Sequence, residues 1–320
     1  MKSTAKAPSN IAFVKYWGRK DETLRLPENG SVSMCLSNLQ TTTTVEFDDK
    51  FEQDEIIFNG KIEDLENNRA VKHLDRVRAL AKIDLKAKVE TSNNFPTGTG
   101  LSSSASGFAA LTVAAAFAAG LKLSGKELSI LARQGSGSAC RSIPDGFVEW
   151  LDGDTSETSY AVSIFPPEHF EIADVVAVVS LDKKFLATSE GQKSARTSPF
   201  FETRLSLIKD KINRVKKAIE DKNFSEFGEL IEREALEFHS ILFTSNPPLF
   251  YWTSETVKVM KFVQKIRSEG LECYFTINTG QDVHVISKKE DAEKVAQKLS
   301  ELPEVIKTII NYPSSGARLI

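Results

Sequence analysis

The chain has 320 residues, of which 41% are hydrophobic and 27% charged, and its formal net charge is −3. This length exceeds what one hydrophobic core usually supports, so we expect two domains. The near-neutral balance offers no basic excess to neutralise a phosphate backbone, which argues against nucleic acid as the main partner.

Cysteine usage and the N-terminal sequence indicate a cytoplasmic protein. The three cysteines, Cys35, Cys140 and Cys273, are widely spaced and form neither a disulfide framework nor a metal-binding knuckle. Isolated thiols fit a reducing compartment, where they behave as small hydrophobic side chains. The first residues lack the apolar core of a signal peptide, and the longest apolar run is too short to cross a bilayer. We therefore expect no membrane partner.

The first half of the chain is expected to be rich in strands. Alternating and β-branched stretches predict strands at 3–14, 31–36, 41–47, 85–90, 147–151 and 175–181, with 56–60 as one arm of a hairpin. Apolar residues at helical spacing predict a helix within 67–81, and 125–133 is expected to form a short helix.

After residue 182 the pattern changes to long amphipathic helices. Apolar stripes predict helices over 205–219, 227–238 and 257–266, whose charged faces are most simply solvated surface. Paired strands are predicted at 273–277 and 283–287, followed by a helix at 291–302 and a strand at 305–310. The change of character predicts two domains, 1–183 and 184–320.

The stretch from 95 to 119 joins a glycine- and serine-rich loop to an apolar helix. Gly98 and Gly100 allow the main chain to approach a ligand closely, and the serines 102–104 supply hydroxyls and a helix N-cap. Free N–H groups in the first helical turn and the helix dipole favour an anion, phosphate above all. The helix lacks a polar face, so we expect it to be buried. Because the loop matches neither a P-loop nor a dinucleotide fingerprint, a capped core helix after an ordinary turn is the alternative.

A second glycine-containing loop, 135–141, carries groups suited to binding an anion. It offers Ser136, Ser138 and Arg141 within a few residues. Arginine suits this work because its planar fork binds two oxygens of a carboxylate or phosphate at once. The alternative for Arg141 is a simple ion pair with Asp145 at a turn.

The segment 15–20 places two lysines and an arginine beside Tyr16 and Trp17. Exposed charge is one interpretation, but two large aromatic residues favour the rim of a packed pocket. His239, on an amphipathic helix, is expected to be a hydrogen-bonded packing residue rather than a base. No cluster of His, Cys and Asp has metal-ligand spacing, so any metal is expected to arrive with a nucleotide.

Five segments together resemble a known family. They are APSNIA (7–12), KYWG (15–18), LPEN (26–29), NFPTGTGLSSSA (94–105) and GSGSACRS (135–142). In these segments, and more weakly in EFHS (237–240) and PPLFY (247–251), the chain resembles the mevalonate diphosphate decarboxylase family of the GHMP kinase superfamily. The similarity runs from about residue 5 to about residue 285.

The resemblance implies an ATP-dependent reaction of the mevalonate pathway of isoprenoid biosynthesis. In that reaction the 3-hydroxyl of mevalonate 5-diphosphate is phosphorylated, and phosphate then leaves as charge builds at C3. Loss of CO2 yields isopentenyl diphosphate. The implied cofactors are ATP and Mg2+, the implied partners are phosphorylated mevalonate and ATP, and a homodimer is the common assembly.

The resemblance also implies a fold: an α+β, two-domain GHMP-kinase-like arrangement with a cleft between the domains. The N-terminal domain is expected to be ribosomal protein S5 domain 2-like and to carry the phosphate-binding loop. The C-terminal domain is expected to be ferredoxin-like.

Site residues are carried over from the family motifs. Lys15 is expected to neutralise charge near the reacting oxygen, and Arg141 to hold the substrate carboxylate. Substrate contacts are expected from Tyr16, Arg19, Arg78, Ser136, Gly137, Ser138 and Arg141. The ATP phosphates are expected at Asn94, Pro96, Gly98, Gly100, Leu101, Ser102, Ser103 and Ser104, with Ser104 also catalytic and holding Mg2+.

The chain departs from the family at its third motif. The family pattern reads Asp-Ala-Gly-Pro-Asn, with the aspartate assigned to the 3-hydroxyl, whereas this chain has NTGQD at 278–282. Asn278 can position the hydroxyl by hydrogen bonding but does not accept its proton at neutral pH. Either the transfer needs no base at that position, or Asp282 or Asp145 supplies one, and our preference is Asp282.

Three alternatives to the decarboxylase follow. Arg196 is offset by one position from an arginine that some members place two residues before Thr197, so a 5-monophosphate substrate is one alternative. A mevalonate 3-kinase-like enzyme without decarboxylation is another, which Arg141 and Lys15 disfavour because a kinase has less need of a carboxylate clamp. The last is a non-catalytic ligand-binding homologue that kept the cleft.

Overall fold

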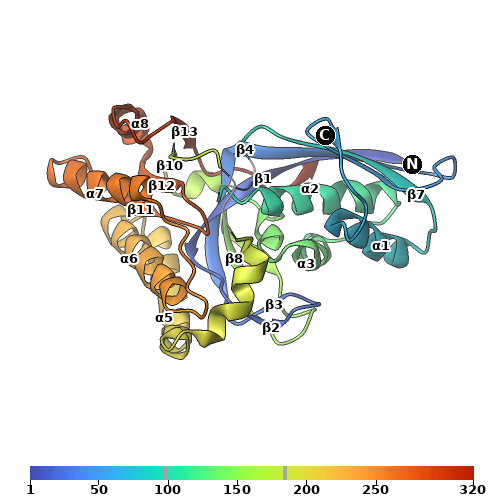
Figure 1. Cartoon of the computed structure of the whole chain (residues 1–320), viewed down its shortest axis with the longest axis horizontal. Helices are drawn as coiled ribbons and strands as arrows, with labels where there is room; N and C mark the ends of the chain where they lie inside the picture. The colour runs from blue at the N-terminus through green and yellow to red at the C-terminus, as the bar shows by residue number, and fades with distance from the viewer. Residues whose placement is uncertain (97, 99, 183–185) are drawn as a thin grey trace.

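Two antiparallel-rich β-sheets of different size organise the chain, and helices pack around them (Figure 1). The computed structural model describes residues 1–96, 98, 100–182 and 186–320. The larger sheet has eight strands and the smaller has four. A separate two-stranded ribbon is formed by β2 (Arg19–Asp21) and β3 (Leu26–Pro27).

The larger sheet is built around one long strand. Its strands are β1 (Lys2–Val14), β4 (Ser31–Asp48), β5 (Glu55–Phe58), β6 (Lys61–Ile62), β7 (Lys86–Asn93), β8 (Phe147–Trp150), β9 (Ala161–Phe165) and β14 (Arg318–Leu319). One side of β4 pairs with β1, and the two halves of its other side pair with β7 and β8. The two strands predicted at 31–36 and 41–47 are therefore one strand, with a register shift opposite Pro8 and Asn10 where the sequence predicted a break.

The smaller sheet contains β11 (Cys273–Thr276), β12 (Val283–Lys288), β10 (Ile172–Val178) and β13 (Lys307–Asn311), in that spatial order. The predicted pairing of the strands around residues 278–282 is confirmed, because Thr276 pairs with His284 across β11 and β12. The chain end returns to the larger sheet, where β14 pairs with β1. The domain boundary predicted at 183 lies outside the described residues, so the division into 1–183 and 184–320 stays a prediction.

Three helices cover one side of the larger sheet: α1 (Arg69–Ala81), α2 (Ser103–Ala118) and α3 (Gly125–Gly135). The central one, α2, is buried on almost every side, as its apolar sequence predicted. Its alanines share one hydrophobic cluster with residues of β1, β4, α1 and α3. Small side chains allow this close approach, so the helix is packed in the core over most of its length.

The C-terminal helices are α4 (Thr188–Gly191), α5 (Phe201–Glu220), α6 (Phe224–Phe243), α7 (Ser254–Ser268) and α8 (Ala292–Ser300). Helices α7 and α8 share a hydrophobic cluster with one set of side chains on the smaller sheet. Helices α5 and α6 belong to another cluster, which also contains the end of β1 and side chains of β10 and β12. Phe13 of β1 meets Phe227 of α6 edge-on, with ring centroids 4.8 Å apart. The two halves of the molecule therefore share one core.

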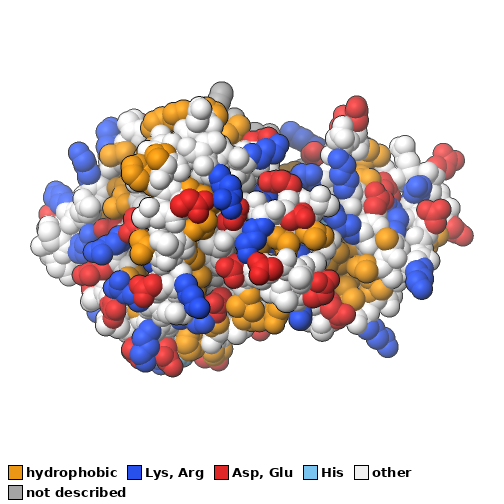
Figure 2. All heavy atoms as spheres, turned by 90° about the horizontal axis from the view of Figure 1, so that it is seen from below, with side chains coloured by type: hydrophobic (Ala, Val, Ile, Leu, Met, Phe, Trp, Pro, Cys, Tyr) orange, Lys and Arg blue, Asp and Glu red, His pale blue; other side chains and the backbone are white. Residues whose placement is uncertain are grey.

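Short 3-10 helices complete the structure: η1 (Gly137–Ser142), η2 (Pro167–His169), η3 (Gln192–Thr197) and η4 (Lys289–Asp291). The first of these replaces the loop predicted at 135–141. On the face drawn in Figure 2, basic and acidic side chains are interspersed, in keeping with the small net charge. In the part of the chain that the structure describes, no helix is both long and apolar enough to span a membrane.

The shared core predicts that Phe227→Ala destabilises the whole molecule. Phe227 is fully buried, so truncation removes its contacts with Phe13 and leaves a cavity, at a cost of about 3–5 kcal/mol in the free energy of unfolding. Urea unfolding measures the change. Leu236→Ala on the same helix is the control, because Leu236 is 39% exposed and its truncation should cost less than about 1 kcal/mol. Equal losses for the two variants would contradict the shared core.

Candidate functional site

A cavity of about 250 Å³ opens where the two predicted anion-binding stretches meet the C-terminal half. Its lining includes residues that follow β1, the loop before α2, η1, α4 and the connection between β11 and β12. Most predicted site residues lie together on it: Lys15, Tyr16, Arg19, Gly98, Gly100, Ser102, Ser103, Ser104, Ser136, Gly137, Ser138, Arg141 and Asn278.

Three residues predicted to hold the ATP phosphates lie outside the cavity lining. The Asn94 side chain accepts a hydrogen bond from the Gln40 backbone N–H at 2.8 Å and so ties the loop to β4. Leu101 is buried in the core, and Pro96 does not line the cavity. These residues support the loop, whereas the glycines and serines face the cavity.

Arg78 was predicted to contact substrate, and the structure does not bring it to the cavity. Its guanidinium forms a buried ion pair with Asp54 and a second one with Asp75 at 2.7 Å. Its Nε donates to the Leu85 carbonyl at 2.8 Å. Arg78 therefore joins α1 to neighbouring segments of the larger sheet, and we withdraw it from the site.

The two carboxylates considered as bases also lie away from the cavity lining. The Asp282 side chain is 3% exposed, and its Oδ1 accepts a hydrogen bond from the Val179 backbone N–H at 3.0 Å. The Asp145 side chain accepts from the Gly316 backbone N–H at 2.6 Å. Each carboxylate accepts a hydrogen bond from the backbone of a segment distant in sequence, and neither one lines the cavity. Asp282 is therefore withdrawn as the preferred base.

Sequence reasoning missed two arginines that line the cavity, Arg25 and Arg69. Arg25 has a positive φ of 52° in the turn before β3, and its Nε donates to the Gln134 carbonyl at 3.1 Å. Arg69 begins α1 and lies over the Phe108 ring, 4.8 Å from its centroid. The turn-rich stretch 24–30 was a usable signal for Arg25. Arg69 carried no signal, because only the packing of α1 on α2 brings it to the cavity.

The cavity is strongly cationic although the protein as a whole is slightly acidic. Five basic side chains line it: Lys15, Arg19, Arg25, Arg69 and Arg141. Among the described lining residues there is no Asp or Glu. Burial lowers the pKa of Arg69 to about 10 and also lowers the pKa of Arg141, because desolvation penalises a charge that lacks an anion. Such a cavity favours a ligand with several negative charges.

Arg141 is held by neutral groups only, as far as the described residues show. Its guanidinium donates to Asn10 Oδ1 at 3.1 and 3.2 Å and to Ser31 Oγ at 2.9 Å. The ion pair with Asp145 that was the alternative does not form. A buried guanidinium, 4% exposed and fixed by uncharged acceptors, keeps its full charge available for an anionic ligand.

The N-terminus of α2 and the loop before it form the other wall. Ser102 stands at the N-cap position but makes no side-chain cap bond, so the predicted serine cap is not formed. Its Oγ instead accepts from Asn278 Nδ2 at 3.2 Å. Gly100 has a φ of +118°, and a Cβ added there would come 2.6 Å from Gly280 Cα. The loop thus closes directly onto the C-terminal half, and this contact requires a glycine.

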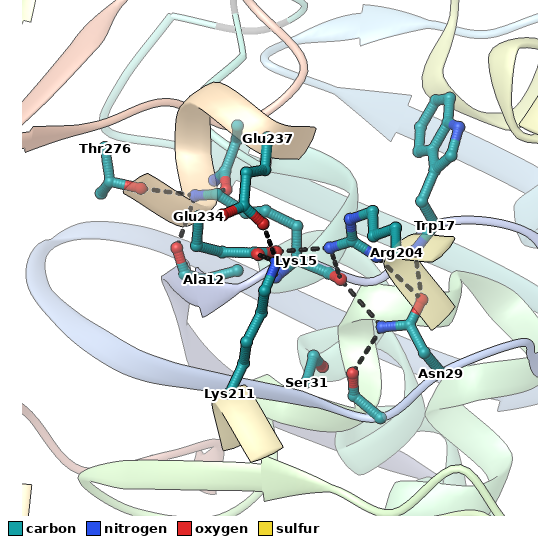
Figure 3. Close-up of polar contacts among 12 residues, drawn as sticks. Ala12, Lys15, Trp17, Asn29, Ser31, Arg204, Lys211, Glu234, Glu237 and Thr276 are labelled. Carbon is teal, nitrogen blue, oxygen red and sulfur yellow. Dashed lines mark hydrogen bonds and ion pairs between the residues drawn. The ribbon is translucent and has the colours of Figure 1, made fainter. Parts of the chain in front are cut away.

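Lys15 lies at the junction of the two halves (Figure 3). Its Nζ donates to the Ala12 carbonyl at 2.5 Å, to Thr276 Oγ1 at 2.8 Å and to Asn278 Oδ1 at 3.3 Å. Its backbone N–H donates to Glu234 Oε1 at 3.1 Å, and its carbonyl accepts from Arg204 Nη2 at 3.0 Å. The buried Arg204–Glu234 ion pair therefore holds the Lys15 peptide from both sides.

Burial lowers the pKa of Lys15 to about 7. Arg141 and Arg204 lower it as well, whereas the Glu234 and Asp174 carboxylates raise it. At neutral pH the amine is therefore present in both its charged and its neutral form.

These features define a class of protein: a helix N-terminus, serine hydroxyls and buried cations on one cavity are typical of enzymes that transfer phosphoryl groups. The chain matches the family model "diphosphomevalonate decarboxylase-like N-terminal domain" over residues 7–161 and the model "mevalonate 5-diphosphate decarboxylase C-terminal domain" over residues 174–315. A diphosphomevalonate decarboxylase of Candida albicans is 38% identical over 307 residues, which cover 90% of this chain and 85% of that protein.

Solved structures agree with these matches. A crystal structure of mevalonate diphosphate decarboxylase from Staphylococcus aureus is 38% identical, with a TM-score of 0.94 over 100% of this chain and 98% of that one. A structure of MDDEF in complex with MVAPP, AMPPCP and magnesium is 37% identical, with a TM-score of 0.93 over 100% of this chain and 99% of that one. The chain belongs to the mevalonate diphosphate decarboxylase family. The predicted two-domain α+β, GHMP-kinase-like fold is confirmed.

The cationic cavity predicts that pyrophosphate stabilises the protein without any turnover. A ligand present at 100 times its Kd raises the free energy of unfolding by about 2.7 kcal/mol, which is measured as a higher Tm. Arg69→Gln should reduce the shift because it removes a cation from the cavity.

Arg196→Gln is the matched control for this measurement, because Arg196 pairs with Glu28 at 2.7 Å and does not line the cavity. This variant should keep the full shift. A shift that Arg69→Gln leaves intact would place pyrophosphate at another surface.

Proposed function

We propose that this protein is an ATP-dependent decarboxylase that converts mevalonate 5-diphosphate to isopentenyl diphosphate, with release of ADP, phosphate and CO2. The observation that carries the proposal is that Arg141, Lys15 and the serine loop before α2 face one cavity without a carboxylate among its described lining residues. Membership of the decarboxylase family supports the same reaction.

ATP is proposed to lie across the N-terminus of α2. An apolar groove next to the cavity is lined by side chains that include Ile56, Phe58, Val89, Phe108 and Leu111. The groove and the cavity share Arg69, Ser103 and Ser104. A nucleoside in the groove would extend its phosphates toward the serine hydroxyls and the free N–H groups of the helix.

The residues present fit a magnesium ion that enters with the nucleotide. Magnesium keeps several waters and takes phosphate oxygens with only one or two protein ligands, so a carboxylate cage is not needed. The Ser104 hydroxyl lines the cavity at the helix N-terminus and is proposed as its protein ligand. When bound, the ion neutralises charge on the phosphates.

Arg141 is proposed to hold the substrate carboxylate. Phosphoryl transfer is mostly positioning and electrostatic stabilisation, which suits a cavity of fixed cations. Departure of phosphate makes C3 electron-poor, and the electron pair of the bond to the carboxylate then forms the new double bond. A fixed guanidinium keeps that carboxylate aligned until CO2 leaves.

A diphosphate is favoured over a monophosphate by three further arginines. Arg19, Arg25 and Arg69 line the cavity, and Arg19 Nε donates to the Tyr16 hydroxyl at 2.8 Å. Together they provide positive charge for a second phosphate group. Arg196 does not supply this charge, because it pairs with Glu28 and Glu202.

A cytoplasmic homodimer remains our prediction from the sequence.

A substrate panel tests the function. The protein is incubated with ATP, Mg2+ and each of mevalonate, its 5-phosphate and its 5-diphosphate, and ADP, phosphate and CO2 are measured. We expect equal amounts of all three products with the 5-diphosphate. ADP without CO2 would indicate a 3-kinase, preference for the 5-phosphate would indicate the monophosphate decarboxylase, and no ADP would indicate a binding protein.

Arg141→Ala is expected to lower kcat/KM for the substrate by at least ~100-fold, because the carboxylate loses its fixed cation in a desolvated site. Arg141→Lys should recover little, since an ammonium lacks the planar fork. Steady-state kinetics with the 5-diphosphate measure both variants. Near-normal turnover in Arg141→Ala would remove the carboxylate assignment.

A further inference from the structure

Phosphorylation of a hydroxyl releases a proton, and the cavity holds few groups able to take it up. Its described lining contains no Asp, Glu or His, and Asn278 presents a neutral amide. The residues outside the described part are Thr97, Thr99, Lys183, Lys184 and Phe185, which carry neither a carboxylate nor an imidazole. Among the described lining residues, the remaining titratable groups are Lys15, Tyr16 and four arginines.

Lys15 is placed for this task by three contacts. Its side chain is buried and lines the same cavity as Arg141 and Asn278. Hydrogen bonds from Nζ to Thr276 and Asn278 aim the amine at the segment that faces the serine loop. The Arg204–Glu234 pair holds its backbone, and the bonds from Nζ to Thr276 and Asn278 position the amine.

We propose that Lys15 is the proton acceptor for the substrate hydroxyl during phosphoryl transfer, a role that rests on the proposed decarboxylase. The other basic lining groups suit the task poorly. Guanidinium groups remain protonated, and burial raises the pKa of Tyr16, which keeps its hydroxyl neutral and weakly basic.

The charged groups around Lys15 do not hold its amine in the protonated form at neutral pH. Burial is the largest cause of its pKa of about 7. Of the two carboxylates that raise it, Glu234 on α6 is committed to Arg204 and Lys211, and Asp174 on β10 is committed to His284 at 2.8 Å.

The remaining groups facing Lys15 are two cations and a neutral ring. Arg141 on η1 and Arg204 on α5 both lower its pKa. His239 on α6 approaches the Asn278 carbonyl at 3.2 Å, and burial lowers the pKa of His239 to about 3, so this ring stays neutral. His239 is thus a packing residue, as its sequence position predicted.

The step balances without an added reagent. The O–H bond of the substrate breaks, its proton forms a new N–H bond on the neutral Lys15 amine, and the oxygen electron pair attacks the γ-phosphorus of ATP. The bond from the γ-phosphorus to the bridging oxygen breaks, and its electron pair leaves with ADP. The resulting ammonium then lies beside the phosphorylated oxygen, where its charge favours departure of phosphate.

Asn278 is matched to this role. A carboxylate in its place would lie next to the Lys15 amine and would hold it in the charged form. A neutral amide accepts a hydrogen bond from Nζ at 3.3 Å without adding charge. The asparagine therefore does not stabilise the charged form of the amine, and proton uptake depends on the neutral form.

The first test measures the titration of Lys15 directly. Protein labelled with [ε-13C]lysine is titrated by NMR, and the Lys15 resonance is assigned by its loss in Lys15→Arg. We expect a midpoint near 7 in the wild type and a midpoint raised by more than one pH unit in Asn278→Asp. A wild-type midpoint above 9 would overturn the proposal.

The second test is rescue. The wild type should lose kcat below pH 7, as the amine becomes protonated, and Lys15→Arg should lower kcat by at least ~100-fold although it keeps the charge. Lys15→Arg combined with Asn278→Asp should recover at least tenfold of that loss, with the fall in kcat moved to below about pH 5 by the introduced carboxylate. Lys20→Arg is the control, since Lys20 pairs with Asp154 outside the cavity.

The outcomes separate the two proposals. The role of Lys15 would be overturned, and the proposed decarboxylase activity retained, by either of two results. One is a kcat of Lys15→Arg within fivefold of the wild type. The other is a double variant that shows no recovery of kcat but still shows the pyrophosphate shift in Tm. A wild type that forms no ADP from any mevalonate substrate would overturn both.

Discussion

The buried ion pair between Arg204 and Glu234 is the interaction on which the site depends. It joins α5 to α6 and forms hydrogen bonds with the backbone N–H and carbonyl of Lys15, just after β1 (Figure 3). Two helices of the C-terminal half therefore hold the end of a strand of the N-terminal half. Breaking such a pair costs about 3–5 kcal/mol because an unpaired charge stays buried. The pair fixes the backbone of Lys15, from which the side chain extends to Thr276 and Asn278.

The second constraint is the charge of the cavity. Five basic side chains, four of them arginines, converge on it while the described lining supplies only neutral acceptors. Burying uncompensated charge is unfavourable in the free protein, and it is offset when a polyanionic substrate and nucleotide bind. Burial is the largest cause of the lowered pKa of Lys15, and Arg141, one of the cations that favour an anionic ligand, lowers it further.

Much of this site could be predicted from the sequence because its parts are local. The glycine–serine loop, the apolar helix after it, Arg141 and Lys15 lie in short motifs, and the structure brings them to one cavity. Arg78 and Asp282 could not be placed, because their partners, such as Asp54 and the Val179 backbone, are distant in sequence. Arg69 was missed for the same reason.

The long strand β4 shows a similar limit. Its sequence predicted a break, whereas pairing with β1 continues on both sides of a register shift. Local propensity does not decide such a case, because the partner strand supplies the hydrogen bonds.

A crystal structure with mevalonate 5-diphosphate and a non-hydrolysable ATP analogue tests the central claim most directly. The account predicts the substrate carboxylate paired with the Arg141 guanidinium and the 3-hydroxyl within hydrogen-bond distance of Lys15 Nζ. A hydroxyl bonded instead to a carboxylate of the protein, with the substrate carboxylate in solvent, would contradict it.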